Sequence, residues 1–198
     1  MVSGLYDNLG TLLFISVFGK GQRLSAHLTI RPEESADFAA IRQVNELAFG
    51  RPAEADIVDS LRQRGVVFLS LVAVQQSQLV GHILFSPVSV VSQAGTFEAV
   101  ALGPMAVLPS HQRQGIGSQL VRRGLEECRQ MGQLLVIVLG HPDFYPRFGF
   151  KTASPFGIRW EYDVPLEAFM LAELNPGALH GRSGVVFYQP EFWEESSP

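Results

Sequence analysis

The chain has 198 residues, 46% of them hydrophobic, and a formal net charge of −4. A chain of this length and composition can bury one sizeable hydrophobic core, which predicts a single domain. The negative net charge, with no run rich in Lys and Arg, argues against a nucleic-acid-binding surface, which normally needs a clustered basic face.

Residues 9–18 form an apolar run near the N-terminus. The run is too short to cross a bilayer, which takes roughly 20 residues. It does not fit a signal peptide, because Asp7 and no Lys or Arg precede it and no convincing small-residue cleavage site follows. Three alternatives stay open: an extra strand, a hydrophobic arm onto a partner subunit in a homodimer, or a segment that an upstream start codon adds and the fold does not require.

The elements that follow alternate between strands and helices. Residues 27–31 predict a first strand, and Ser35 is a candidate N-cap for a helix whose apolar residues recur at helical spacing over 38–47. A second helix is predicted from Pro52 to a stop at Gly65. Three strands joined by short links come next, most simply as an antiparallel meander, over residues 68–74, 79–90 and 97–107.

Pro104 interrupts the third strand of this meander. Proline cannot donate a hydrogen bond to a sheet ladder and is confined to sheet edges and bulges. A bulge is one interpretation, and the alternative is that Gly103–Pro104 bends a sheet edge.

Gly115 and Gly117 then open a helix. The first turn of a helix has four backbone N–H groups without intrahelical partners and carries the positive end of the dipole, so it favours an anion. Glycines there remove side chains that would hold a phosphate away. The pair fits neither the P-loop nor the dinucleotide-binding motif, and the alternative is a tight turn at the helix entry. The helix continues with apolar residues at roughly helical spacing, at Ile116, Leu120, Val121 and Leu125.

The only cysteine, Cys128, lies one turn beyond Leu125 on the apolar side of this helix. We expect a small buried side chain here rather than a nucleophile. A single cysteine cannot form an internal disulfide, which suits a reducing compartment and predicts a cytoplasmic protein. A fully buried strand over residues 134–139 follows, and then an aromatic segment over 140–150.

Taken together, these segments resemble the core signature of the GNAT superfamily of acyl-CoA-dependent N-acetyltransferases. The resemblance rests on a strand, the Gln112–Gly117 helix start, a second buried strand, and Tyr145 four residues before Gly149–Phe150. Residues 81–87, 102–107 and 147–150 further resemble a bacterial subgroup of predicted N-acetyltransferases. The similarity runs from about His27 to Trp193. It implies one domain over 27–193, with an N-terminal extension over 1–26 and an acidic tail over 194–198.

The resemblance implies a mixed α/β fold with a central, mostly antiparallel twisted sheet, splayed between its two central strands and flanked by helices. It implies acetyl-CoA as co-substrate, no metal, and direct transfer of the acetyl group to a primary amine of a small molecule or peptide. The pantetheine arm would pair with one strand and the pyrophosphate would lie on the helix start. The residues expected to bind acetyl-CoA are Met105, Ala106, Val107, Gln112, Arg113, Gln114, Gly115, Ile116, Gly117 and Ser118.

Tyr145 occupies the position that in similar enzymes donates a proton or a hydrogen bond to the CoA sulfur. A phenol with an ordinary pKa of about 10 is protonated at neutral pH and can act as an acid. The alternative is a tyrosine packed in an aromatic cluster with Phe144, Phe148 and Phe150, and the two interpretations are compatible.

No general base can be assigned from the sequence. Some superfamily members carry a Glu on the strand before the glycine-bearing helix, but residues 101–103 here contain no acid. His141 either lines the pantetheine channel or starts a turn. Residues 154–184 are expected to form one wall of the acceptor site. The candidates for the base stay open: Glu98, which a regular strand would point to the opposite face, and Glu33, Glu46, Asp56 and His82.

Three functions compete at this point. The leading one is an acetyl-CoA-dependent N-acetyltransferase. The second is a catalytically silent acyl-CoA-binding or sensing module, suggested by the missing strand carboxylate, although Tyr145 favours the enzyme because a pure CoA binder needs no phenol beside the sulfur. The third is an interaction protein that assembles through the apolar N-terminal run. Neither nucleic acid nor a membrane is expected as a partner.

Overall fold

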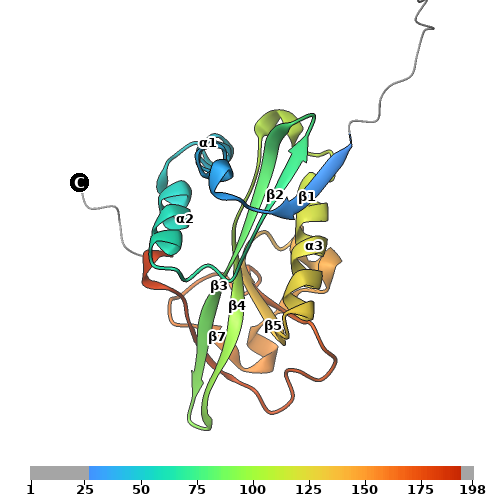
Figure 1. Ribbon diagram of the computed structural model, residues 1–198. Helices are drawn as coiled ribbons and strands as arrows, with labels where there is room; N and C mark the ends of the chain where they lie inside the picture. The colour runs from blue at the N-terminus through green and yellow to red at the C-terminus, as the bar shows by residue number, and fades with distance from the viewer. Residues whose placement is uncertain (1–26, 193–198) are drawn as a thin grey trace, which may run out of the picture.

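The structure is a computed structural model that describes residues 27–192 (Figure 1). The N-terminal extension over 1–26 and the acidic tail over 194–198 lie outside the described residues. All three interpretations of the apolar run, the homodimer arm among them, therefore stay open. Within residues 27–192, no helix combines the length and the hydropathy that crossing a bilayer requires.

A nine-stranded mixed sheet forms the centre of the described domain. The strand order is β1-β2-β3-β4-β5-β8-β6, and β9 pairs with both β3 and β7. All pairs are antiparallel except β4 with β5 and β7 with β9, so the predicted meander and the mostly antiparallel sheet are confirmed. The strands are β1 (Leu28–Pro32), β2 (Leu69–Gln75), β3 (Gln78–Ser92), β4 (Gly95–Val107), β5 (Leu135–Leu139), β6 (Lys151–Thr152), β7 (Ile158–Trp160), β8 (Phe169–Glu173) and β9 (Gly184–Phe187).

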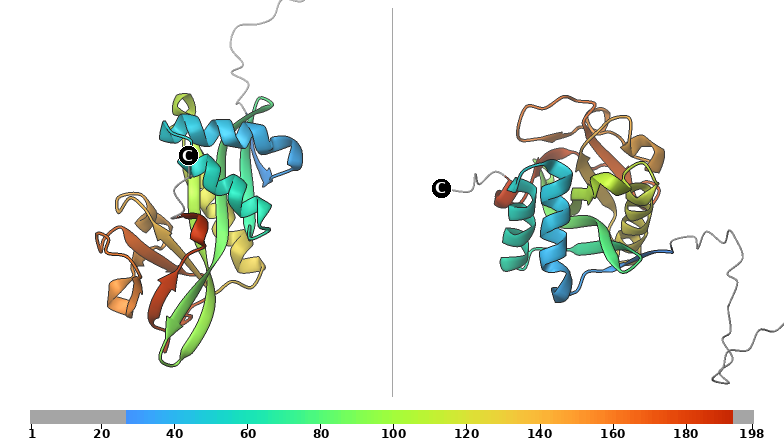
Figure 2. Two further views of the ribbon diagram at one scale, coloured as in Figure 1. Left: turned by 90° about the vertical axis from the view of Figure 1, so that its left-hand side faces the viewer. Right: turned by 90° about the horizontal axis from the view of Figure 1, so that it is seen from above.

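Helices cover both faces of this sheet, with α1 and α2 on one side and α3 on the other (Figures 1 and 2). The apolar spacing of each helix explains this placement, since Ile41 and Leu61 pack against Leu84 on one face and Leu120 packs with Phe85 on the other. The α-helices are α1 (Phe38–Phe49), α2 (Ala53–Gln63) and α3 (Ile116–Gln130). Short 3-10 turns occupy Ser35–Asp37, Pro109–His111, Tyr145–Phe148, Ser154–Phe156 and Pro190–Phe192.

The predicted N-cap of the first helix is wrong. Ser35 lies inside a 3-10 turn, and helix α1 begins at Phe38. The carboxylate of Asp37 instead accepts the backbone N–H of Glu34 at 2.8 Å and the guanidinium of Arg31 at 2.6 and 2.9 Å. A charged acceptor held by an arginine forms stronger hydrogen bonds than a serine hydroxyl, so Asp37 organises this entry.

Helix α3 packs unusually close to the sheet at Gly124. A Cβ atom added there would lie 2.5 Å from the ring of Phe85, which is fully buried. Cys128, one turn further along, is also fully buried, and this burial raises the pKa of its thiol to about 12. The expectation of a small buried side chain is confirmed.

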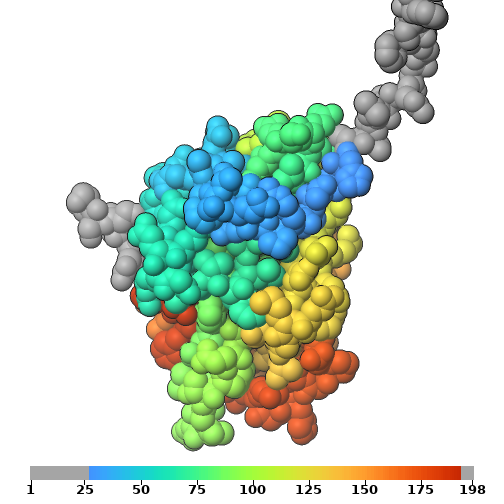
Figure 3. Space-filling model, viewed as in Figure 1, coloured from blue at the N-terminus to red at the C-terminus, as the bar shows by residue number. Residues whose placement is uncertain are grey.

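Strands β4 and β5 separate soon after they meet. Their parallel pairing consists of Val100 opposite Val136 and Ala101 opposite Ile137, and it ends there. The register between β3 and β4 shifts between Ile83 and Phe85, across from Gly103–Pro104, so the predicted bulge is confirmed. Beyond the bulge, the edge of β4 faces the space that opens between β4 and β5. The opposite end of β4 joins β3 in a hairpin that projects from the lower end of the molecule (Figure 3).

Candidate functional site

A cleft with a volume of about 890 Å³ lies where β4 and β5 have separated. Four parts of the chain form its walls: the end of helix α1, the end of β4, the turn and first residues of α3, and the segment that follows β5. The lining residues are Phe49, Met105, Val107, His111, Gln112, Arg113, Gly115, Ile116, Gly117, Ser118, Gly140, His141, Asp143, Phe144, Tyr145 and Arg147.

The start of helix α3 presents backbone donors to this cleft. The first main-chain hydrogen bond of the helix runs from the N–H of Gln119 to the carbonyl of Gly115 at 3.1 Å. The amides of Ile116, Gly117 and Ser118 therefore precede the first intrahelical bond, and all three residues line the cleft. Converging donors at the positive end of a helix dipole are suited to hold a phosphate group.

The two glycines of this helix start serve different needs. Gly115 has a φ of 82°, in the left-handed region that side chains disfavour, and a Cβ there would contact nothing within 4 Å. Gly117 has no such φ, but a Cβ there would contact Met105 and Phe144, each at 3.7 Å. Gly115 is thus required by the backbone, while Gly117 keeps the cleft open to larger groups.

The cleft brings together most of the residues predicted to bind acetyl-CoA. Ala106 and Gln114 do not line it. Ala106 is buried and stands opposite His82 in the β3–β4 ladder, and the side chain of Gln114 donates to the carbonyl of Ser110 at 3.2 Å. The side chain of Gln112 donates to the carbonyl of Val107 at 3.1 Å, which ties the turn to the end of β4. The predicted residues that do line the cleft are Met105, Val107, Gln112, Arg113, Gly115, Ile116, Gly117, Ser118 and Tyr145.

Tyr145 lines the cleft from the segment after β5 and is buried. Its ring makes edge contacts with Phe144, at 5.1 Å between ring centroids, and with Phe150, at 5.4 Å. The ring borders the cleft and packs in an aromatic cluster, so its position is compatible with both sequence interpretations, and the acid role stays a prediction. Burial raises the pKa of the phenol to about 12, so the side chain is neutral and protonated at physiological pH.

Gly140 fixes the place of this ring. A Cβ atom added at Gly140 would overlap Cε2 of Tyr145, which shows that the ring packs directly on the backbone at the end of β5. The N–H of Gly140 donates to the carbonyl of Ala168 at 2.9 Å, so the backbone under the ring is itself anchored to the neighbouring chain segment.

Several residues of the cleft were not predicted from the sequence. Phe49 reaches it from the end of helix α1, and no local pattern marks that contact. Arg147 stacks over the ring of Phe144 at 4.6 Å, and its Nε donates to the carbonyl of the same residue at 2.9 Å. Arg147 belongs to the run 147–150 that resembles the GNAT subgroup. That resemblance did not predict that Arg147 lies at the cleft, because its position there follows from the turn that precedes it. The others are His111, Gly140, Asp143 and Phe144.

His141 both lines the cleft and starts the turn, so its two sequence interpretations are compatible. Its carbonyl accepts the backbone N–H of Phe144 at 3.0 Å.

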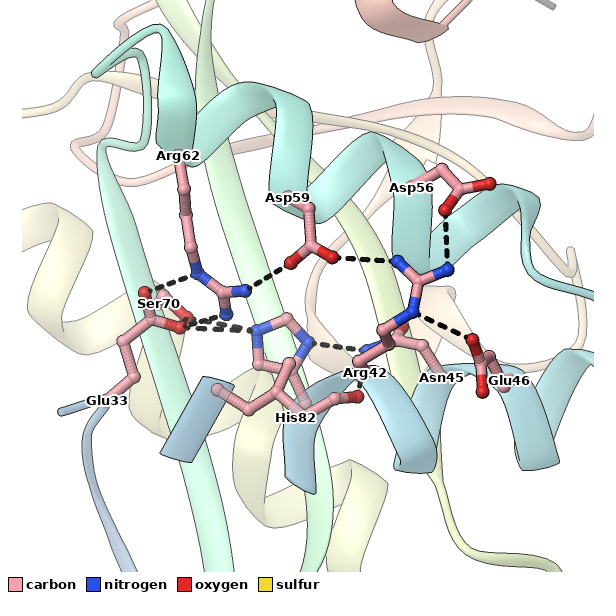
Figure 4. Close-up of polar contacts among 10 residues, drawn as sticks. Glu33, Arg42, Asn45, Glu46, Asp56, Asp59, Arg62, Ser70 and His82 are labelled. Carbon is pink, nitrogen blue, oxygen red and sulfur yellow. Dashed lines mark hydrogen bonds and ion pairs between the residues drawn. The ribbon is translucent and has the colours of Figure 1, made fainter. Parts of the chain in front are cut away.

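The residues that the sequence offered as a general base lie outside the cleft lining. Figure 4 shows that Glu33, Glu46 and Asp56 instead belong to a network of ion pairs between helices α1 and α2 and the adjoining strands. Arg42 contacts Glu46 and Asp56 at 2.9 and 2.7 Å, and Arg62 contacts Glu33 at 2.6 Å. Glu98 accepts a hydrogen bond from Ser89 at 3.0 Å, near the hairpin end of the sheet.

His82 is fully buried at the centre of this network. The amide nitrogen of Asn45 can only donate, so Nδ1 of His82 accepts its hydrogen bond, at 3.1 Å, and the ring proton lies on Nε2. Nε2 then donates to Ser70 at 3.0 Å, and the hydroxyl of Ser70 donates to Glu33 at 2.5 Å (Figure 4). Burial, with the positive charge of Arg62, lowers the pKa of His82 to about 3. This geometry suits a structural role and gives the ring no access to a substrate.

Within residues 27–192, no group of three or more His, Cys, Asp or Glu side chains could hold a metal ion.

Comparison with known proteins gives one consistent match. The model of a GNAT acetyltransferase domain family matches residues 29–153. The uncharacterized N-acetyltransferase YhbS of Escherichia coli K12 is 35% identical over 166 residues, which cover 83% of this chain and 98% of that protein. The uncharacterized N-acetyltransferase YjhQ of the same organism is 38% identical over 144 residues, covering 71% of this chain and 80% of YjhQ.

Solved structures of GNAT family proteins are also similar to this chain. The crystal structure of YhbS from Escherichia coli in complex with CoA superposes with a TM-score of 0.81 at 34% identity, covering 87% of this chain and 95% of that one. A GNAT family acetyltransferase from Brucella melitensis in complex with acetyl-CoA gives a TM-score of 0.70 at 36% identity, covering 84% of this chain and 99% of that one.

Proposed function

This chain belongs to the GNAT acetyltransferase family, and from that premise we propose that it transfers the acetyl group of acetyl-CoA directly to a primary amine of a small molecule or peptide. The observation that carries the proposal is the cleft, in which the donors of the α3 start and the phenol of Tyr145 border the same space. Cys128 is the only cysteine, so we place the reaction in the cytoplasm.

Different residues of the cleft suit different parts of acetyl-CoA. The amides of Ile116, Gly117 and Ser118 would receive the pyrophosphate, with Arg113 as a charge partner. The pantetheine amides would pair with the edge of β4 at Met105 and Val107, which β5 leaves open after Ala101. A volume of about 890 Å³ is large enough for a ligand of this class.

Tyr145 would act at the sulfur. When the amine attacks the thioester carbonyl, a new C–N bond forms, the C–S bond breaks, and the leaving thiolate needs a proton. A protonated phenol fixed against Gly140 can supply that proton or a hydrogen bond. The attacking amine must first lose a proton of its own, and His111, His141 and Asp143 are the cleft residues whose side chains can accept one.

The proposal is tested by calorimetry with acetyl-CoA and by a thiol-release screen against a panel of amines. Gly117→Glu should weaken binding of acetyl-CoA by both bulk and charge, whereas Gly117→Ala, whose Cβ makes only ordinary contacts, should retain binding. Because Cys128 is buried, the released CoA thiol is measured without interference from the folded protein.

Two results would contradict the proposal. If Gly117→Glu folds and binds acetyl-CoA as tightly as the parent protein, the ligand does not lie over the α3 start. If the protein binds acetyl-CoA but releases no thiol with any amine, it is the silent acyl-CoA-binding module.

A further inference from the structure

A second pocket, with a volume of about 320 Å³, lies on the sheet face opposite helix α3. Residues 154–169 supply all of its lining. Two of these, Trp160 and Phe169, belong to the core cluster that contains Ile137, whereas the neighbouring Val136 packs with the α3 cluster. Alternation along β5 therefore puts the pocket and helix α3 on opposite faces of the sheet.

Aromatic rings form the walls of this pocket. Trp160 stacks on Phe169 with ring centroids 6.1 Å apart and an interplanar angle of 13°. Tyr162 meets Trp160 edge-on at 5.5 Å, and half of its surface is exposed. Trp160 and Phe169 are buried, so Tyr162 is the exposed ring of this wall. The face of an aromatic ring carries negative electrostatic potential and attracts organic cations.

The charges at the rim favour a cation as well. Glu161 and Asp163 line the pocket and are exposed, and neither carboxylate forms an ion pair with another residue of the range 27–192. Arg159 also lines it. Two carboxylates against one guanidinium leave the rim negative, and a bound cation would meet both the carboxylates and the aromatic wall.

The pocket shares no lining residue with the cleft, but the β5–β8 ladder links the two. Phe169 stands opposite Leu139 in the β5–β8 ladder, and the next residue, Gly140, lies under the ring of Tyr145. On the other side, Trp160 contacts Tyr188, with 5.4 Å between the ring centroids. A group bound in the pocket would thus lie close to the reacting centre without being the reacting atom.

We propose that this pocket binds a second, non-reacting cationic group of the amine acceptor, so that the preferred acceptor is an organic dication with an amine at each end of a flexible chain. The inference rests on the proposed function, because it names the class of amine that the same reaction takes. One amine would reach the thioester beside Tyr145 while the other is held by Tyr162, Glu161 and Asp163.

The test compares putrescine and spermidine with butylamine, which has one amine. In the parent protein we expect the KM for the two polyamines to be at least roughly tenfold below that for butylamine, a difference of about 1.4 kcal/mol in binding. The double variant Glu161→Gln/Asp163→Asn should remove this preference without changing the KM for acetyl-CoA or the rate with butylamine. Arg159→Gln is the matched rim control and should lower the KM for the polyamines.

Binding measured without turnover separates this inference from the proposed function. Calorimetry of spermidine with the CoA-saturated protein should show binding that the double variant loses. If spermidine binds in this way but no amine releases thiol, the proposed function fails and the cation site stands. If thiol is released and the double variant keeps the parent preference, or if Arg159→Gln weakens the polyamines, the cation site is overturned and the proposed function stands.

Discussion

Tyr145 combines a fixed position with a fixed protonation state. Its ring is held between Phe144, Phe150 and the backbone of Gly140, so its orientation does not depend on a bound ligand. Its pKa of about 12 keeps the phenol protonated over the whole range in which an enzyme of this type works. A group with these properties is an acid or a hydrogen-bond donor and not a base.

Tyr145→Phe should lower kcat by roughly 10²-fold or more, which is the range of general acid catalysis. The KM for acetyl-CoA should change little, because the phenol is needed mainly as charge develops on the sulfur. Stability should also change little, since the phenyl ring still fills the aromatic cluster. Steady-state kinetics with the best amine decides the point, and full turnover by the variant would rule out the acid role.

Gly140→Ala should reduce kcat through Tyr145. The added methyl group would overlap the tyrosine ring, so the ring must move away from its place at the end of β5. Calorimetry should show nearly parental affinity for acetyl-CoA, because the α3 start is untouched. The double variant Gly140→Ala/Tyr145→Phe serves as the control: its kcat should be close to that of Tyr145→Phe alone, and an additive loss would mean that Gly140 acts independently of the phenol.

At the scale of elements, the polar network around His82 joins helix α1 to the sheet. Asn45 of α1, His82 of β3 and Ser70 of β2 form a continuous chain of hydrogen bonds that ends on Glu33. Helix α1 carries Phe49 at its end, which lines the cleft. The network therefore sets the position of one cleft wall without itself touching the cleft.

This network should make stability depend on acidic pH. The pKa of His82 is lowered to about 3 in the folded protein, against about 6.5 in the unfolded chain. The contribution of neutral His82 to the free energy of unfolding is complete above pH 6.5. It is lost as the pH falls from there toward 3, because only the unfolded state gains the proton. Between pH 7 and pH 5 the loss from this residue is up to about 2 kcal/mol.

Urea unfolding at the two pH values measures this loss, with His82→Gln as the comparison. The variant should be less stable at pH 7 but should lose less stability on acidification, because Gln does not titrate. If the stability of both proteins depended equally on pH, His82 would not be neutral in the folded protein, even if the variant were less stable at pH 7.

The elements that local patterns specify could be predicted, and those that depend on distant contacts could not. Apolar spacing located helices α1, α2 and α3, and Pro104 located the bulge, because each signal lies within one segment. The cap at Asp37 was missed because it depends on Arg31 from the preceding strand. The pairing of His82 with Asn45, and the approach of Phe49 to the cleft, bring together residues that are far apart in the chain, and no pattern in the sequence marks them.

The same distinction applies to the site. The glycines and Tyr145 could be placed because the order and spacing of a family signature were present, but a motif does not show which member of a run faces the ligand. The alternation of β4 turns Ala106 away from the cleft that Met105 and Val107 line, and Gln114 bonds back to its own turn. The pocket around Trp160 follows residue 153, where the matched family model ends, so the family signature does not describe it.

For the molecule as a whole, the cleft lies where a short parallel pairing joins two parts of the sheet. Strands β4 and β5 share only two register pairs, although they join the part of the sheet that contains β1 to β3 to the part that contains β8 and β6. A ligand wedged between them would contact β4, the start of α3 and the segment after β5 at once. Binding should therefore stabilise the fold globally.

Acetyl-CoA at a hundred times its Kd should stabilise the folded protein by about 2.7 kcal/mol if it does not bind the unfolded chain. For a domain of this size, that corresponds to a rise in Tm of roughly 5–10 °C. Scanning calorimetry should show this rise in the parent protein and in Gly117→Ala, and none in Gly117→Glu at the same ligand concentration. The three proteins should have similar Tm values without ligand, because a side chain at Gly117 extends into the cleft and not into the core. If Gly117→Glu also gained the full rise, acetyl-CoA would be binding elsewhere on the chain.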